Sequence, residues 1–184
     1  MTSPPLPLGE GRGEGSSDPT ARTRQIAARL TAANQTLATV ECAIAGALGA
    51  ALTDVAGASA WYAGGVAPYS ARAKETLLGL GRDAFAGHGA VSPEAALLLA
   101  RAARERLGAD WALAETGLLG PRGAHRSAKE PGTAHLALVG PNDLTIEREV
   151  RTGLDDRLAN KRAFLAAALD LLADGISTNV EIAV

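Results

Sequence analysis

The chain has 184 residues, of which 47% are hydrophobic and 21% charged, and its formal net charge is −2 at pH 7. These values are typical of a one-domain globular protein and exclude a broad nucleic-acid-binding surface, while leaving room for a local basic pocket that holds one phosphate. Two Trp and two Phe are too few for a base-stacking platform. No apolar run approaches the roughly 20 residues that span a bilayer. We therefore expect no nucleic-acid partner and no membrane span.

The sequence contains a single cysteine, Cys42, which excludes an internal disulfide. A lone cysteine favours a reducing compartment. The N-terminus also lacks the apolar core of a signal peptide. These features predict a cytoplasmic location.

Composition divides the chain into three parts. Residues 1–18 are rich in Pro, Gly and Ser, and their apolar surface is too small to offset the entropy lost on ordering, so they predict a disordered leader. Residues 19–174 carry the periodic patterns of a folded domain. Residues 175–184 are expected to form a frayed tail.

Helical periodicity and capping signals predict five helices. The first covers residues 20–34, and the second follows Cys42 with Leu48 and Leu52 one turn apart. Ser70 caps a short third helix that Gly79 ends, and Ser92-Pro93-Glu94 starts a fourth that Gly108 ends. Asp155-Asp156 opens the last helix, whose expected apolar stripe is Leu158, Leu165, Leu169 and Leu172.

Strand signals lie near residues 37, 62, 111, 135 and 146 and interleave with these helices. The pattern predicts an α/β sandwich with a mixed sheet, in which crossovers supply parallel strands and a hairpin around residues 140–143 an antiparallel pair. The strand that begins at Trp111 is expected to end at Ala114, before a glycine-punctuated loop that extends to Pro131. Ligands of such sheets bind where strands end and helices begin, so the loops after Val40 and Ala114 are the expected pocket walls.

Three pieces of sequence are candidates for chemistry in that pocket: Cys42, Tyr69 with Lys74, and Thr116. A cysteine at a helix N-terminus has a lowered pKa, and a lysine desolvated in a pocket is a suitable base for a nucleophile. The alternatives stay open at this point. A free cysteine is commonly a small buried hydrophobe, and a helical lysine usually points into solvent.

Neither a metal nor an organic cofactor is predicted. The three histidines, His88, His125 and His135, stand alone, without the spacing of metal ligands. The glycine-rich stretch at 117–123 matches neither a Walker loop nor a dinucleotide fingerprint, although its backbone amides are suited to a phosphate.

Across residues 22–172 the sequence resembles the C-terminal domain of the CinA competence/damage-inducible proteins, known as nicotinamide-nucleotide amidase. No single motif is specific, but their order and spacing together are. The matching segments are Leu52-Thr53-Asp54-Val55, Gly57-Ala58-Ser59, Gly64-Gly65-Val66, Tyr69-Ser70, Ala73-Lys74, Leu77-Leu78-Gly79, His88-Gly89-Ala90-Val91-Ser92, Thr116-Gly117, Gly120-Pro121, Pro131-Gly132-Thr133 and Asp156-Arg157.

The resemblance implies a three-layer α/β/α fold with a mainly parallel sheet, a homodimer, and hydrolysis of nicotinamide mononucleotide to nicotinic acid mononucleotide and ammonia. In the family a serine in a Glu-Ser-Cys-Thr-Gly-Gly motif is the nucleophile and a lysine is its base. Carried over, the base is Lys74 and its neighbouring tyrosine is Tyr69. The substrate-binding residues would be Glu41, Gly46, Thr116, Gly117, Gly120 and Arg157.

This chain departs from the family pattern around the nucleophile. Ungapped alignment places Cys42 at the serine, Ala43 at the cysteine and Ile44 at the threonine. Glu115 and Arg122 replace a small or apolar residue and a glycine. The departures leave three hypotheses: an amidase that uses Cys42, a member that binds a nucleotide or protein partner without hydrolysis, and an amidase whose substrate preference is changed by Glu115.

Overall fold

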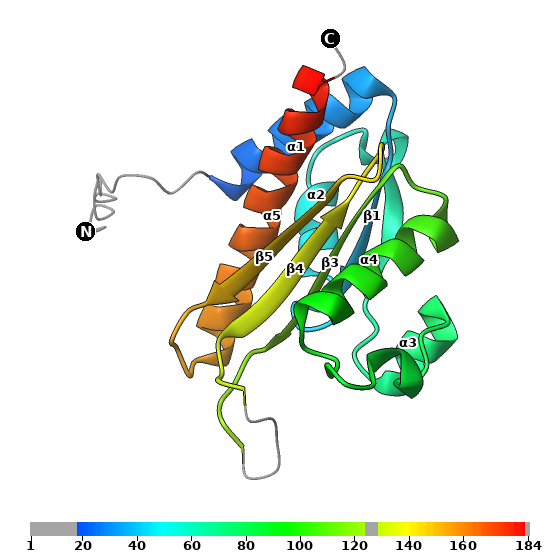
Figure 1. Ribbon diagram of the computed structural model, residues 1–184. Coiled ribbons are helices and arrows are strands. Elements are labelled where there is room, and N and C mark those ends of the chain that lie inside the picture. Colours follow the sequence, from blue (N-terminus) through cyan, green and yellow to red (C-terminus); the bar gives the residue numbers. More distant parts are fainter. Residues whose placement is uncertain (1–17, 124–128, 183–184) are drawn as a thin grey trace, which may run out of the picture.

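The computed structural model describes residues 18–123 and 129–182, which form a five-stranded sheet with helices on both faces (Figure 1). The strands are ordered β2-β1-β3-β4-β5. β1 pairs in parallel with both β2 and β3, whereas β4 is antiparallel to both β3 and β5. Four strands therefore run in one direction and β4 in the other, which confirms the predicted α/β sandwich. The strands are β1 (Leu37–Glu41), β2 (Tyr62–Val66), β3 (Trp111–Leu118), β4 (Thr133–Val139) and β5 (Thr145–Arg151).

The helices divide between the two faces of the sheet (Figure 1). One face is covered by α1 (Pro19–Ala33), α2 (Ala47–Thr53) and α5 (Arg157–Ile182), and the other by α3 (Ala71–Leu78) and α4 (Pro93–Leu107). The predicted caps are present: Ser70 accepts from the Ala73 amide and Ser92 from the Ala95 amide. Two short 3-10 helices, Ala58–Ala60 and Arg82–Phe85, complete the elements.

Alternation along the strands builds a separate half of the core on each face. In β3, Trp111 and Leu113 pack against α1, α2 and α5, while Ala112 and Ala114 face α4. The alanine-rich half accommodates close packing of α4, because small side chains let the helix approach the sheet. The next residue in the first series is Glu115, so its side chain points to the α5 face.

Two expectations about element boundaries and one about an apolar stripe were wrong. β3 continues through Glu115 to Leu118, because its pairing with β4 extends along the full strand. Residues 175–182 of the expected tail are instead part of α5, in which Ile176 is buried and Gly175 passes so close to β4 that an added Cβ would lie 2.4 Å from Leu138 Cδ2. Leu158 is 56% exposed and lies outside the apolar stripe of α5. The predicted leader falls outside the described residues apart from Asp18, which caps α1.

The topology brings the candidate residues to one edge of the sheet. β1, β2 and β3 run parallel, so Cys42, Tyr69 and the loop after Leu118 all follow carboxyl ends at the same edge. β4 begins at this edge and β5 ends there, which adds the segment before Thr133 and the start of α5 with Arg157.

Candidate active site

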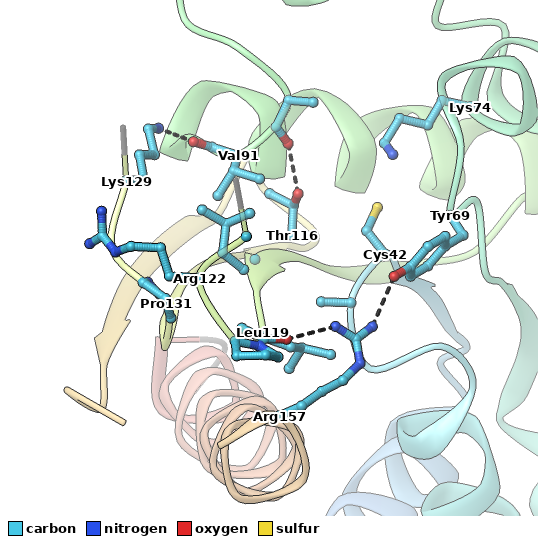
Figure 2. Close-up of a pocket in the computed structure, with 17 residues that line it drawn as sticks. Cys42, Tyr69, Lys74, Val91, Thr116, Leu119, Arg122, Lys129, Pro131 and Arg157 are labelled. Carbon is cyan, nitrogen blue, oxygen red and sulfur yellow. Dashed lines mark hydrogen bonds between the residues drawn. The ribbon is translucent and has the colours of Figure 1, made fainter. Parts of the chain in front are cut away.

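A cavity of about 530 Å³ opens at this edge (Figure 2). Seven of the nine residues predicted for the site line it, namely Cys42, Tyr69, Lys74, Thr116, Gly117, Gly120 and Arg157. Glu41 and Gly46 are not among the residues that line the cavity. The fold thus brings together the residues predicted for the nucleophile, its base and most of the binding surface.

Cys42 lies in the turn that follows β1, and only 7% of its surface is exposed. The expectation that it starts a helix was wrong, because α2 begins only at Ala47. Burial raises the pKa of the Cys42 thiol to about 12, while the neighbouring Lys74 ammonium acts to lower it. The free protein therefore holds Cys42 as a neutral thiol at neutral pH, not as the thiolate that a helix N-terminus would favour.

Glu41 occupies the helix N-terminus that was expected to serve Cys42. Its Oε2 accepts from the Leu48 amide at 2.8 Å and its Oε1 from the Gly49 amide at 2.8 Å. These amides belong to the first turn of α2, and Gly46 is the residue that precedes that helix. Two of the six predicted substrate-binding residues therefore have structural roles: Glu41 satisfies free amides of α2, and Gly46 leads the chain into that helix.

Lys74 is a buried lysine on α3, with an exposed fraction of 6%. Its Nζ donates to the carbonyl oxygen of Pro68 at 2.9 Å. Figure 2 shows the amine directed at the Cys42 sulfur across the inner end of the cavity. This geometry excludes the solvated position usual for a helical lysine and places the Lys74 amine next to the thiol.

Thr116 also lines the cavity, close to Cys42. Its hydroxyl donates to the carbonyl oxygen of Ala90 at 2.7 Å, so its proton is committed to the backbone and its remaining lone pairs can only accept. An amide NH₂ group is a suitable partner for such an oxygen, whereas a carboxylate is not.

Gly117, the next residue, packs tightly behind the wall. A Cβ there would lie 2.8 Å from the Ala134 Cβ and 2.9 Å from Phe164 Cε2. The glycine therefore lets β3 approach both β4 and α5 at the base of the cavity.

Tyr69 and Arg157 form the mouth of the cavity (Figure 2). Tyr69 is 64% exposed, and its hydroxyl accepts from Arg157 Nη2 at 2.9 Å. Arg157 Nη1 donates to the Gly120 carbonyl at 3.0 Å, which ties the start of α5 to the loop after β3. Tyr69 thus contacts Arg157 at the rim, while Lys74 and Cys42 lie deeper.

The cavity carries positive charge. Among the described residues that line it, Lys74, Arg122, Lys129 and Arg157 are basic, and none is acidic. Arg122 replaces the glycine usual in the family, and at the exposed rim its side chain pairs with Glu130. Even with Arg122 paired to Glu130, the lining carries an excess of basic side chains, which favours an anionic ligand such as a phosphate.

Glu115 does not face the cavity, contrary to the third hypothesis from the sequence. Its side chain is fully buried, and Oε2 accepts from the Ala43 amide at 2.9 Å and from the Ile44 amide at 3.1 Å. Burial raises the pKa of the Glu115 carboxyl to about 7, against the lowering effect of these two hydrogen bonds. Glu115 thus binds the turn that contains Cys42 from the side opposite the cavity. Its charge does not face the cavity, so the structure does not support an effect of Glu115 on substrate preference.

The described residues contain no group of three His, Cys, Asp or Glu side chains arranged to hold a metal ion. Nor is any helix in the described ranges both long and apolar enough to cross a bilayer.

Comparison with known proteins identifies the family. The model of the CinA C-terminal domain family matches residues 20–176, which is most of the chain. The chain belongs to the CinA C-terminal domain family. A CinA-like protein of Parasynechococcus marenigrum is 43% identical over 125 residues, covering 67% of this chain and 30% of the relative. One of Anaeromyxobacter dehalogenans is 39% identical over 148 residues, covering 80% and 36%. The chain thus spans about a third of the length of the curated relatives it matches.

Solved structures of the CinA superfamily share the fold. The competence/damage-inducible protein CihA of Agrobacterium tumefaciens is 34% identical with a TM-score of 0.78, covering 85% of this chain and 94% of its own. A CinA superfamily protein of Klebsiella pneumoniae is 26% identical with a TM-score of 0.80, covering 88% and 99%. The predicted family and three-layer architecture are therefore confirmed.

Proposed function

We propose that this protein hydrolyses the carboxamide of nicotinamide mononucleotide, giving nicotinic acid mononucleotide and ammonia. The observation that carries the proposal is the position of the Lys74 amine beside the Cys42 thiol at the closed end of a cation-lined cavity. A thiol with an adjacent base is suited to acyl transfer from an amide. The basic rim suits a phosphate, and a cavity of about 530 Å³ lies within the range of small-molecule sites.

In the proposed reaction, Lys74 in its neutral form takes the thiol proton as the sulfur attacks the carboxamide carbon. The tetrahedral intermediate collapses, and Lys74 returns the proton to the leaving nitrogen, which departs as ammonia. Water, activated by the same amine, then attacks the thioester and releases the carboxylate. The raised pKa of the Cys42 thiol makes this proton transfer essential, because little thiolate exists beforehand.

Binding contacts follow from the side chains available. Thr116 Oγ1 accepts from the carboxamide NH₂, since its own proton is committed to Ala90. Arg157, at the start of α5, contacts the phosphate together with the other basic side chains at the mouth. In this arrangement the nucleotide lies with its amide inside and its phosphate outside.

The test is ammonia release from nicotinamide mononucleotide by the purified protein. We expect turnover that Cys42→Ala abolishes and that Cys42→Ser, which restores the family's usual nucleophile, retains in part. An unchanged rate in Cys42→Ala would exclude Cys42 from the reaction.

A second candidate function is binding of a mononucleotide without hydrolysis. It is favoured by the high pKa of the Cys42 thiol and by Ile44, a buried apolar side chain at the position of the family's threonine. Calorimetry distinguishes the two functions. Saturable mononucleotide binding with no ammonia release supports the second, and steady ammonia release eliminates it. Assembly as a homodimer is part of neither proposal and stays an expectation from the family resemblance.

A further inference from the structure

Glu115 is a fully buried titratable group that has no role in the proposed reaction. Its backbone carbonyl accepts from the Cys42 amide at 3.1 Å, and its Oε2 accepts from the amides of Ala43 and Ile44. Three consecutive amides, beginning at the candidate nucleophile, are therefore bonded to one residue on β3. No other described residue makes as many of these bonds to the Cys42 turn.

The carboxylate reaches this turn from the side opposite the cavity. Glu115 follows Trp111 and Leu113 on the α5 face of β3 and is fully buried, whereas Thr116 faces the cavity. Its second oxygen, Oε1, has no hydrogen-bond partner among the described residues. A buried carboxylate with an unsatisfied oxygen destabilises a fold, and the two hydrogen bonds that Oε2 accepts from the Cys42 turn offset part of this cost.

Two departures from the family pattern meet at this contact. Ile44 removes the hydroxyl with which a threonine bonds to its surroundings, and the Ile44 amide is one of the two amides that Glu115 holds. The carboxylate thereby provides the turn with an anchor that its own side chains lack.

We propose that Glu115 is a positioning residue that fixes the Cys42 turn and sets the reactivity of its thiol. The proposal rests on the proposed role of Cys42 as nucleophile. Because the Ala43 and Ile44 amides are bonded to Glu115, they are not available to an oxyanion, whose donors must come from the cavity side. The charge of Glu115 opposes ionisation of the thiol, and Lys74 on α3 acts in the other direction. Glu41 at the end of β1 is the other carboxylate that acts on Glu115.

The variants separate hydrogen bonding from charge. Glu115→Gln keeps an acceptor for both amides and removes the charge, while Glu115→Ala removes both. Glu41→Gln is the matched control, because Glu41 is also a buried carboxylate bonded to two consecutive backbone amides, those of α2.

The first measurement is the rate of alkylation of Cys42, the chain's single cysteine, by iodoacetamide between pH 8 and pH 10. It needs no substrate, so its result for the effect of Glu115 on the Cys42 thiol does not depend on the proposed function. We expect faster alkylation in Glu115→Gln, because loss of the negative charge favours the thiolate, and a smaller change in Glu41→Gln. Equal rates in the native protein and Glu115→Gln would overturn the proposal.

The second measurement is the split between kcat and KM for ammonia release. Misplacing a nucleophile by about 1 Å costs on the order of 10²-fold in rate, so we expect kcat to fall by this order in Glu115→Ala with KM little changed, and to recover in Glu115→Gln. If the native protein releases ammonia and Glu115→Ala has the same or a higher kcat, Glu115 does not position Cys42 for the reaction. In that case the positioning proposal fails while the proposed function stands.

Discussion

At the scale of single residues, the site depends on a proton transfer between two buried groups. Cys42 is held as a thiol with a pKa of about 12, and Lys74 is placed beside it on α3 with one hydrogen bond to Pro68. Burial makes the thiol a poor nucleophile on its own, but it also excludes water from the amine that must accept its proton. The two side chains are therefore expected to work as a unit.

Lys74→Met tests this unit. We expect ammonia release from nicotinamide mononucleotide to fall by about 10²–10⁴-fold, the usual contribution of a positioned acid–base group. Methionine preserves most of the length and the apolar stem of lysine, so it fills the space that the Lys74 side chain occupies. The matched control is Lys161→Met on α5, a lysine that does not line the cavity. Comparable losses in both variants would remove Lys74 from the reaction.

The Glu115 carboxyl makes a separate prediction about pH and stability. Its pKa is raised from 4.5 to about 7 in the folded protein, so its contribution to stability is full below pH 4.5 and is lost as the pH rises through about 7. At about 1.4 kcal/mol per pKa unit, the loss is on the order of 3 kcal/mol. Glu115→Gln lacks this titration.

Urea unfolding of both proteins from pH 4.5 to pH 8 measures the difference. We expect the free energy of unfolding of the native protein to fall relative to that of Glu115→Gln over this range. Two curves that stay parallel would show that Glu115 titrates normally.

At the scale of elements, the site is assembled from strand ends and helix starts that the chain brings to one edge. Arg157 illustrates this, because it is the first residue of α5 and reaches across to the loop after β3 and to Tyr69 before α3. One side chain thereby connects three segments at the mouth of the cavity.

Arg157→Gln tests the assignment of the phosphate to this mouth. A hydrogen bond to a charged group contributes about 1.5–3 kcal/mol, so we expect KM for nicotinamide mononucleotide to rise by about 10- to 100-fold. KM for nicotinamide riboside, which lacks the phosphate, should change much less. Arg162→Gln, an exposed arginine on the same helix outside the cavity, is the control. An equal rise for both substrates would place the phosphate elsewhere.

Gly117 tests the packing of β3 against its neighbours. A methyl group at this position meets Ala134, Phe164 and the Thr133 carbonyl within 3.0 Å, so Gly117→Ala should destabilise the fold by about 1–3 kcal/mol. Gly123→Ala, where an added Cβ meets nothing within 4 Å, should leave the free energy of unfolding nearly unchanged. Chemical denaturation compares them, and an equally stable Gly117→Ala would refute the close approach.

At the scale of the whole molecule, helix limits and strand positions are the features that local signals predicted well. Ser92-Pro93 and Gly108 bound α4 as expected, because caps and breakers act through adjacent backbone groups. The continuation of α5 past Gly175 was missed, since it depends on contact with Leu138 on a distant strand. Four of the seven predicted residues that line the cavity, Cys42, Tyr69, Lys74 and Thr116, were singled out from their places in the chain, and Gly117, Gly120 and Arg157 came from the family resemblance. Glu41 and Glu115 were misassigned because only the sheet register shows which face each carboxylate occupies.

The covalent state of Cys42 during turnover tests the central claim most directly. The protein is mixed with nicotinamide mononucleotide, quenched in acid and measured by intact mass and peptide mapping. We predict an adduct on Cys42 equal to the substrate minus ammonia, present in the native protein and absent from Cys42→Ala, which releases no ammonia. Ammonia release by Cys42→Ala at the native rate, with no adduct in either protein, would contradict the account.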